Sequence, residues 1–290
     1  MKSALAVALA ALALPGPAAA APAEWTEPTA PFHVIDNVYY VGSAGISAWI
    51  IKTPAGLILL DAGMPEYAPT VEAYIRALGF RLADVKILLN SHAHFDHSGG
   101  LARIKADTGA RLIASAGDRH ALEHGVYDGS EDDHSLDSPP VKVDALVADG
   151  GSVALGGVKL TAMITPGHTA GCTNYLLTVR ENGKDGQGRP HTAFFFCSAS
   201  VAANRLVPKA QYAGIVADYR RTFARLKTVK ADVFLAPHAE FYDLAGKRAR
   251  LGRPGPNPFI VPGELQKVVA ALERGFIKSL ADQTTKAAVR

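Results

Sequence analysis

The sequence predicts an α/β fold, specifically a four-layer αββα sandwich of two mixed, largely antiparallel sheets that helices flank. Strand-type runs are followed by helix-type runs twice along the chain, first over residues 38–125 and again over residues 152–280. Each half therefore supplies one sheet and the helices that cover one of its faces, and the two remaining faces can bury each other. No linker-like segment separates the halves, so we predict one domain over residues 21–290.

The first half begins with three short β-type runs, which turn signals at Gly42-Ser43 and Pro54-Ala55-Gly56 separate into an antiparallel meander. Apolar residues then recur at helical spacing before Gly79, and the apolar run at residues 85–89 is typical of a buried strand. The predicted strands are 38–41, 48–52, 57–60, 85–89 and 111–114, and the predicted helices are 65–78, 101–108 and 116–125.

The second half repeats this order after a long polar segment at residues 127–141, which we predict to be a surface loop. A tract rich in glycine and charge at residues 180–189 predicts a flexible hairpin loop. The predicted strands are 152–154, 158–164, 173–178, 192–196 and 233–236, and the predicted helices are 213–226 and 264–280.

The amino-terminal residues predict export. Met1-Lys2 is followed by an apolar run over residues 4–14 and by Ala18-Ala19-Ala20, which is the pattern of a secretory signal peptide over residues 1–20. The apolar run is too short to span a bilayer, and the sequence offers no longer one. The mature chain is therefore predicted to be exported, which in a bacterium means the periplasm.

The two cysteines, Cys172 and Cys197, are of interest because an exported protein meets an oxidising compartment, where a disulfide can form. The sequence does not show whether they pair. Both are treated as small buried residues unless the geometry brings their sulfur atoms together.

The stretch Ser91-His92-Ala93-His94-Phe95-Asp96-His97 follows the predicted strand at residues 85–89 and places four potential metal ligands within six residues. The cluster should lie on the loop at the carboxyl end of that strand. Three imidazoles and one carboxylate suit zinc or a similar borderline metal. The alternative is a polar loop that is merely rich in histidine, but four such groups so close together favour a metal.

Two later histidines follow predicted strands in the same way. His168 comes after Thr165-Pro166-Gly167, and His238 comes after Ala236-Pro237. Strand-end loops can converge on one edge of a sandwich, so both side chains are candidates to join the cluster. Five histidines and one aspartate divide into two sites of three ligands each, and three protein ligands beside an open position are the usual catalytic zinc arrangement.

His120 and His124 stand at positions i and i+4 of a predicted helix, with Glu123 between them. This spacing places both rings on one helix face. The zinc-helix motif of metalloproteases has its Glu directly after the first His, so we expect a surface or packing role for this pair.

The combination His-x-His-x-Asp-His, a later Gly-His-Thr and a late strand-end His resembles the metallo-β-lactamase superfamily over nearly the whole mature chain. The resemblance implies a catalytic domain over residues 21–290 that binds two zinc ions. The ligands that it implies are His92, His94 and His168 for the first zinc and Asp96, His97 and His238 for the second.

Within this resemblance, Ser198 is the informative residue. Many superfamily members, such as glyoxalase two-type thioesterases and zinc-dependent lactonases, carry there an Asp that bridges the metals, whereas this chain has Cys197-Ser198-Ala199-Ser200. Ser198, together with His92 and His97, is similar to the third subclass of β-lactamases. Cys197 falls one residue early, which should point its side chain away from the metals.

The activity that the resemblance implies is hydrolysis of the amide bond of β-lactam antibiotics by a metal-bound hydroxide, without a covalent acyl-enzyme. Asp96 would be catalytic, because it would orient the hydroxide and could take its proton. Ser198 and Ser200 would bind the substrate carboxylate. Asn204 would hydrogen-bond the developing oxyanion, with a surface asparagine as the alternative. Asp61 would fix the histidine loop from behind, would cap a turn, or would do both.

Two other functions stay open. A zinc hydrolase of lactones or thioesters would use the same ligands, but its bridging carboxylate is missing here. A non-catalytic exported zinc-binding protein would keep the fold, but the complete ligand set argues against it. The net charge is +3 without a long basic run, which argues against nucleic acid. The predicted partner is therefore a small-molecule β-lactam, and the mature chain is expected to be a monomer without membrane contact.

Overall fold

The computed structural model of the protein describes residues 21–181 and 188–288. The predicted signal peptide at residues 1–20 and most of the predicted loop at residues 180–189 lie outside the described residues. Within the described part of the chain, no helix is both long enough and apolar enough to cross a membrane.

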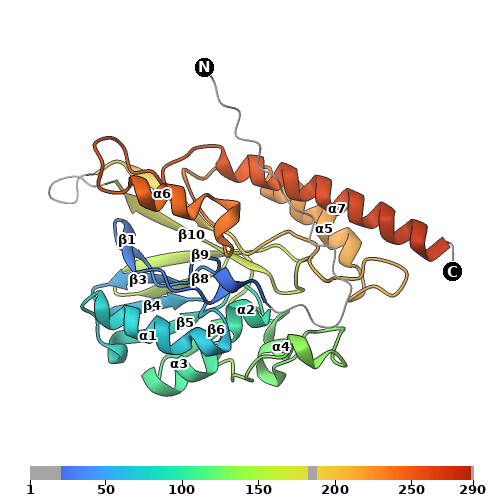
Figure 1. The fold of residues 1–290 in the computed structure, drawn as a ribbon, viewed down its shortest axis with the longest axis horizontal. Helices are drawn as coiled ribbons and strands as arrows, with labels where there is room; N and C mark the ends of the chain where they lie inside the picture. Colours follow the sequence, from blue (N-terminus) through green and yellow to red (C-terminus); the bar gives the residue numbers. More distant parts are fainter. Residues whose placement is uncertain (1–20, 182–187, 289–290) are drawn as a thin grey trace.

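The fold has four layers, as Figure 1 shows. Helices α1 (Ala68–Ala77) and α3 (Leu101–Thr108) lie against the outer face of the first sheet. Helices α5 (Ile215–Leu226) and α7 (Glu264–Ala288) lie against the outer face of the second sheet, and the two sheets face each other in the middle. The predicted αββα sandwich is confirmed.

The first sheet contains seven strands in chain order, antiparallel from β1 to β4 and parallel from β4 to β7. The parallel half arises because α1, α3 and the long segment at residues 115–144 carry the chain back to the starting edge between successive strands. Half of the strand pairs are thus parallel, more than the sequence predicted. The strands are β1 (Phe32–Ile35), β2 (Val38–Tyr40), β3 (Trp49–Thr53), β4 (Gly56–Leu60), β5 (Val85–Leu89), β6 (Arg111–Ala114) and β7 (Ala145–Leu146).

The second sheet contains five strands in the order β12-β11-β10-β9-β8. Its pairs are antiparallel except for β11 with β12, which are parallel because helix α5 crosses between them. The strands are β8 (Ser152–Leu155), β9 (Val158–Ile164), β10 (Thr173–Arg180), β11 (Pro190–Phe195) and β12 (Val233–Leu235), each of which overlaps a predicted strand.

The remaining helices are short and lie at the ends of strands. Helix α2 (Phe95–Ser98) contains part of the histidine cluster, and α4 (Arg119–His124) lies within the predicted helix at residues 116–125. Helix α6 (Leu244–Arg250) was not predicted.

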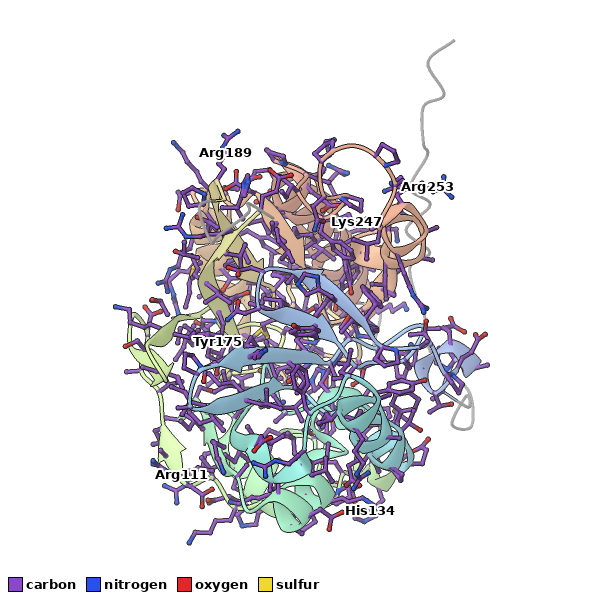
Figure 2. All side chains as sticks on the ribbon, turned by 90° about the vertical axis from the view of Figure 1, so that its left-hand side faces the viewer. Arg111, His134, Tyr175, Arg189, Lys247 and Arg253 are labelled. Carbon is purple, nitrogen blue, oxygen red and sulfur yellow. A yellow bond between two sulfur atoms is a disulfide. The ribbon has the colours of Figure 1, made fainter. Side chains whose placement is uncertain are left out.

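The inner faces of the two sheets meet in one apolar core. Trp49 of the first sheet and Phe195 of the second are both buried, and their ring centroids are 6.0 Å apart. Tyr175 is fully buried in the same core, and Figure 2 shows it in the interior between the labelled surface residues Arg111 and Arg189. Because the two sheets share one core, their relative position is fixed, and so is the edge at which their strand-end loops meet.

Cys172 and Cys197 form a disulfide, with their Cα atoms 5.7 Å apart. The sequence left this pairing open. The bond links the residue before β10 to the residues after β11, and both cysteines are buried. The Cys197 side chain is therefore turned toward Cys172 rather than toward the histidines, in the direction that the one-residue offset predicted.

Candidate metal centre

The histidine cluster begins two residues after β5 and continues into helix α2, at the carboxyl end of the strand where the sequence placed it. The backbone N–H of His97 donates to the carbonyl oxygen of His94 at 3.0 Å, which closes the turn. Gly100 then passes tightly under the end of β4, because a Cβ atom there would lie 2.5 Å from the carbonyl oxygen of Ala62. Only a glycine permits this close passage.

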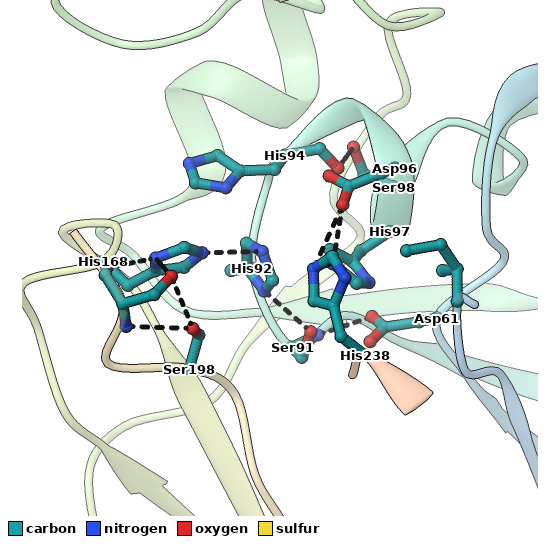
Figure 3. A network of polar contacts seen from close by, with 12 residues as sticks. Asp61, Ser91, His92, His94, Asp96, His97, Ser98, His168, Ser198 and His238 are labelled. Carbon is teal, nitrogen blue, oxygen red and sulfur yellow. Dashed lines mark hydrogen bonds and ion pairs between the residues drawn. The ribbon is translucent and has the colours of Figure 1, made fainter. Parts of the chain in front are cut away.

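His92, His94 and His168 form the first ligand cluster, which Figure 3 shows at close range. The Nε2 atoms of His92 and His168 are 3.1 Å apart. The His94 ring centroid lies 4.7 Å from that of His92 and 4.5 Å from that of His168. All three side chains are buried. The loop after β9 thus carries a ligand candidate from the second half of the chain to the cluster of the first half.

Asp96, His97 and His238 form the second cluster. Asp96 Oδ2 lies 3.1 Å from His97 Nε2 and 3.4 Å from His238 Nε2, and the two Nε2 atoms are 3.2 Å apart. Burial alone would raise the pKa of Asp96, but the two imidazoles hold it well below its usual range. Trp25 packs against this cluster, with its ring centroid 5.4 Å from that of His238; no pattern in the sequence indicates this contact.

The donor set fits metal ions. His168 Nδ1 donates to the carbonyl oxygen of Ser200 at 2.8 Å, so its Nε2 carries a lone pair toward His92. Burial holds the pKa values of His92 and His94 well below the usual range and that of His168 at about 4, so all three are neutral imidazoles. Among the described residues, the buried Nδ1 atom of His97 has no hydrogen-bond partner.

Asp61 holds the start of the histidine loop. Its Oδ1 atom accepts hydrogen bonds from the backbone N–H of Ser91 at 2.7 Å and from the side chain of Asn90 at 3.0 Å. The Ser91 hydroxyl in turn lies 3.0 Å from Nδ1 of His92. These bonds have the geometry that we expected for a residue that fixes the loop. The effect of Asp61 on metal binding stays a prediction.

Asp118, which the sequence analysis missed, connects the loops of the first cluster. Its Oδ2 atom accepts from the N–H of Ala93 at 3.2 Å and from the hydroxyl of Thr169 at 3.0 Å, and its Oδ1 atom accepts from the N–H of Gly171 at 2.8 Å. The signal that could have found it is its position just after β6, at the same strand-end edge as the histidines.

Comparison with known proteins identifies the family. The sequence profile of the Metallo-beta-lactamase superfamily matches residues 41–177. BJP-1, a subclass B3 metallo-β-lactamase of Bradyrhizobium japonicum, is 49% identical, with a TM-score of 0.88 over 92% of this chain and 99% of that chain. The chain belongs to the metallo-β-lactamase superfamily. FEZ-1, a metallo-β-lactamase from Legionella gormanii, is 33% identical, with a TM-score of 0.84 over 90% of this chain and 98% of that chain.

Curated relatives with another name match only in part. The hydroxyacylglutathione hydrolase of Rhodospirillum rubrum is 34% identical over 111 residues, which are 38% of this chain and 35% of that protein. The chain thus spans about a third of the length of such curated relatives. The similarity to BJP-1 extends over nearly the whole solved chain, so it carries more weight for the fold and the site.

Ser198 lies beside the first cluster of this superfamily member (Figure 3), and Ser200 contacts His168 of the same cluster. The Ser198 hydroxyl accepts from the backbone N–H of Ser200 at 3.3 Å and lies 3.3 Å from its hydroxyl. The hydroxyl of Ser200 lies 3.3 Å from Nδ1 of His168. The resemblance places a bridging carboxylate of other members at Ser198, and here the hydroxyl of Ser200 lies next to the hydroxyl at that position. Their contact with substrate stays a prediction.

The alternative of a surface position for Asn204 is wrong. Asn204 is buried, and its amide nitrogen lies within hydrogen-bond distance of the carbonyl oxygens of Gly167 and His168 and of the Tyr219 hydroxyl. Its amide oxygen accepts from the hydroxyl of Tyr127 at 3.0 Å. Because both ends of the amide are bonded within the protein, Asn204 supports the His168 loop and is not a surface residue, while a contact with the oxyanion stays a prediction.

The predicted surface loop at residues 127–141 borders the metal centre at its first residue. The Tyr127 ring stacks on His94, with centroids 4.5 Å apart and planes 13° apart, and Tyr127 is buried. Most of the following residues are exposed or half-buried. The loop is therefore anchored at the site and solvated beyond it. His120 and His124, before this loop, are exposed as expected.

Proposed function

We propose that this chain is a zinc-dependent β-lactamase that hydrolyses the amide bond of β-lactam antibiotics with two zinc ions and no covalent acyl-enzyme. The observation that carries the proposal is the meeting of two three-ligand clusters beside a position at which Ser198 replaces a carboxylate. The similarity to BJP-1 and FEZ-1, both described as metallo-β-lactamases, supports the substrate class.

In this proposal the six clustered side chains hold the metals. The first zinc would be bound by His92, His94 and His168, and the second by Asp96, His97 and His238. Zinc bound there supplies Lewis acidity, which polarises a carbonyl and lowers the pKa of water toward ~7. Everything else in the reaction depends on how the chain holds water, protons and substrate.

Asp96 is the residue that we propose to orient the attacking water and to accept its proton. Its Oδ2 atom is turned toward His97 and His238, which leaves Oδ1 as the atom to receive the proton. The half-buried Ser200 hydroxyl would donate to the substrate carboxylate. Ser198 is fully buried and would act mainly by orienting Ser200 through their 3.3 Å contact.

The wider biological setting belongs to the same proposal. Residues 21–290 would form one catalytic domain, which a signal peptide over residues 1–20 would send to the periplasm. There the enzyme would act as a monomer on small β-lactams and could confer antibiotic resistance. Fractionation of cells that express the full chain would test the location, and sedimentation of the purified protein would test the oligomeric state.

A hydrolysis assay tests the activity. The purified mature protein, loaded with zinc, would be given a chromogenic cephalosporin, penicillins, carbapenems, an acyl-homoserine lactone and a glutathione thioester. We expect turnover of β-lactams and at most slow turnover of the lactone and the thioester. Rapid thioester hydrolysis without β-lactam turnover would instead favour the activity named for the partly matching hydroxyacylglutathione hydrolases.

The substitution Ser198→Asp tests why a hydroxyl stands at this position. A carboxylate there would compete for both metals, so β-lactam hydrolysis should fall by about tenfold or more. Ser198→Ala is the matched control, because it removes the hydroxyl without adding a charge and should cost less. Equal rates for the wild type and the Asp variant would show that Ser198 does not face the metals.

A further inference from the structure

We propose that helix α4 carries an auxiliary surface site for a divalent transition-metal ion, bound by His120 and His124. The ion belongs to the borderline class that prefers imidazole ligands, namely Zn²⁺, Cu²⁺ or Ni²⁺. The site is distinct from the six-ligand centre and does not depend on the function proposed above.

The two imidazole rings already lie together on the solvent side of α4. Their centroids are 4.3 Å apart, their planes are 30° apart, and both residues are exposed. Residues at i and i+4 share a helix face, so the two rings can serve the same cation. In the zinc helices of metalloproteases the two histidines bind the metal and the Glu serves as the base. The different position of Glu123 therefore argues against a metalloprotease base, but it does not argue against metal binding by the two histidines.

Hydrogen bonds leave the same nitrogen of each ring free for a metal. His120 Nδ1 lies 2.6 Å from the carboxylate of Asp128, and His124 Nδ1 lies 3.0 Å from the carbonyl oxygen of His120. Carboxylate and carbonyl oxygens only accept, so both Nδ1 atoms carry the proton. In the neutral rings both Nε2 atoms then carry lone pairs. A metal-binding histidine usually has this arrangement, with its other N–H donated to a carboxylate or a carbonyl.

The position of Asp128 gives the proposed site a structural consequence. Asp128 follows Tyr127, whose ring stacks on His94, and it belongs to the loop at residues 127–141. A cation on His120 would strengthen the bond from its Nδ1 to Asp128, because a positive charge on the ring increases the acidity of that N–H. The ion would thus fasten the start of the loop to helix α4.

Metal stoichiometry tests the proposal on the zinc-loaded full protein. Equilibrium dialysis at about pH 8, where imidazole is mostly unprotonated, should give one more bound Zn²⁺ for the wild type than for the double variant His120→Ala/His124→Ala. The control His134→Ala removes another exposed histidine, which pairs with Asp137, and should keep the extra ion. Asp128→Asn should lower the affinity for the extra ion by about tenfold.

A second measurement locates the ion without relying on a variant. Substoichiometric Cu²⁺ added to the zinc-loaded protein should broaden the imidazole C–H resonances of His120 and His124 before those of His134. Equal zinc stoichiometry in the wild type and the double variant, or broadening that spares these two rings, would overturn the proposal. Because the readouts are metal content and resonance width, neither outcome depends on β-lactam hydrolysis.

Discussion

At the scale of single residues, the carboxylate of Asp118 holds together the two loops that supply the first ligand cluster. Ala93 lies in the loop that carries two of the ligands, and Thr169 and Gly171 lie in the loop that carries the third. Burial raises the pKa of Asp118 to about 7, although the hydrogen bonds from Thr169 and Gly171 oppose this shift. The folded protein therefore retains a proton on this group that an unfolded chain would release.

Replacing this carboxylate should change how stability depends on pH. The pKa of Asp118 is 3.8 without burial and about 7 in the fold, so within that window the folded state binds the extra proton. The stability that this group contributes is present below the lower value and is lost as the pH rises through the higher one, by at most about 4 kcal/mol. In Asp118→Asn this decrease of the free energy of unfolding with rising pH should disappear.

Urea unfolding across the same pH window, in the presence of a chelator, measures the effect. Both proteins contain the same histidines, so the difference between the two slopes isolates Asp118. Asp132→Asn, on the exposed loop, is the matched control, and its stability should depend on pH as that of the wild type does. If Asp118→Asn also left this dependence unchanged, Asp118 would ionise as an ordinary surface acid.

Sequence could identify the ligand candidates and Asp61, but not the other residues that support them. Four of the six stand together in the chain, and the other two follow apolar strands, so the local pattern marks them. The role of Asp118 depends on which two loops approach it, and only the tertiary structure determines that. Likewise, the internal hydrogen bonds of the Asn204 amide depend on the tertiary structure and could not be read from the sequence.

At the scale of elements, a buried ion pair joins helix α6 to helix α7. The Lys247 ammonium bonds to the carboxylate of Glu264, and Lys247 is only 1% exposed. The same ammonium lies 5.5 Å from the ring centroid of Tyr242 and 5.6 Å from that of Phe259. Burial lowers the pKa of Lys247, and the carboxylate of Glu264 opposes this shift. The ammonium therefore depends on its partner.

Removal of the carboxylate of this pair, which leaves the buried ammonium behind, should cost more than removal of the ammonium. Glu264→Gln leaves a buried ammonium without a counter-charge and should lower the free energy of unfolding by about 3 kcal/mol. Lys247→Met keeps the apolar stem and leaves the carboxylate of Glu264, which is only half-buried and can reach water, so its cost should be smaller. Asp282→Asn is the control, because it breaks the exposed pair with Lys278 on α7 and should cost less than about 1 kcal/mol. Similar midpoints of urea unfolding for Glu264→Gln and Asp282→Asn would contradict this account.

Sequence predicted the elements that carry strong periodicity or long apolar runs. Helix α3 and strand β6 have the predicted bounds, whereas helix α6 was missed because its sequence contains a glycine and three basic residues in seven positions. The apolar side of α6 is visible only where Leu244 enters the core. The two-residue strand β7 is likewise too short for any pattern.

At the scale of the whole molecule, the ligand candidates come from both halves of the sandwich. His92, His94, Asp96 and His97 belong to the half built on the first sheet, while His168 and His238 follow strands of the second sheet. The isolated bridge between Ile46 and His238 joins the halves at the same edge. Metal ions bound at this edge would cross-link the two layers.

Removal of the metals should therefore lower stability as well as activity. Each metal that binds only the folded chain adds about 2.7 kcal/mol when it is present at 100 times its dissociation constant. In a domain of this size each kcal/mol shifts the melting temperature by about 2–4 °C. Thermal unfolding with excess zinc and with excess chelator should thus differ by several degrees, and added zinc should restore both the melting temperature and the hydrolysis.

His238→Ala removes one ligand of the second cluster and should retain only part of the shift, whereas His120→Ala/His124→Ala should retain nearly all of it. A full shift in His238→Ala would mean that this residue does not help the metals to join the two sheets.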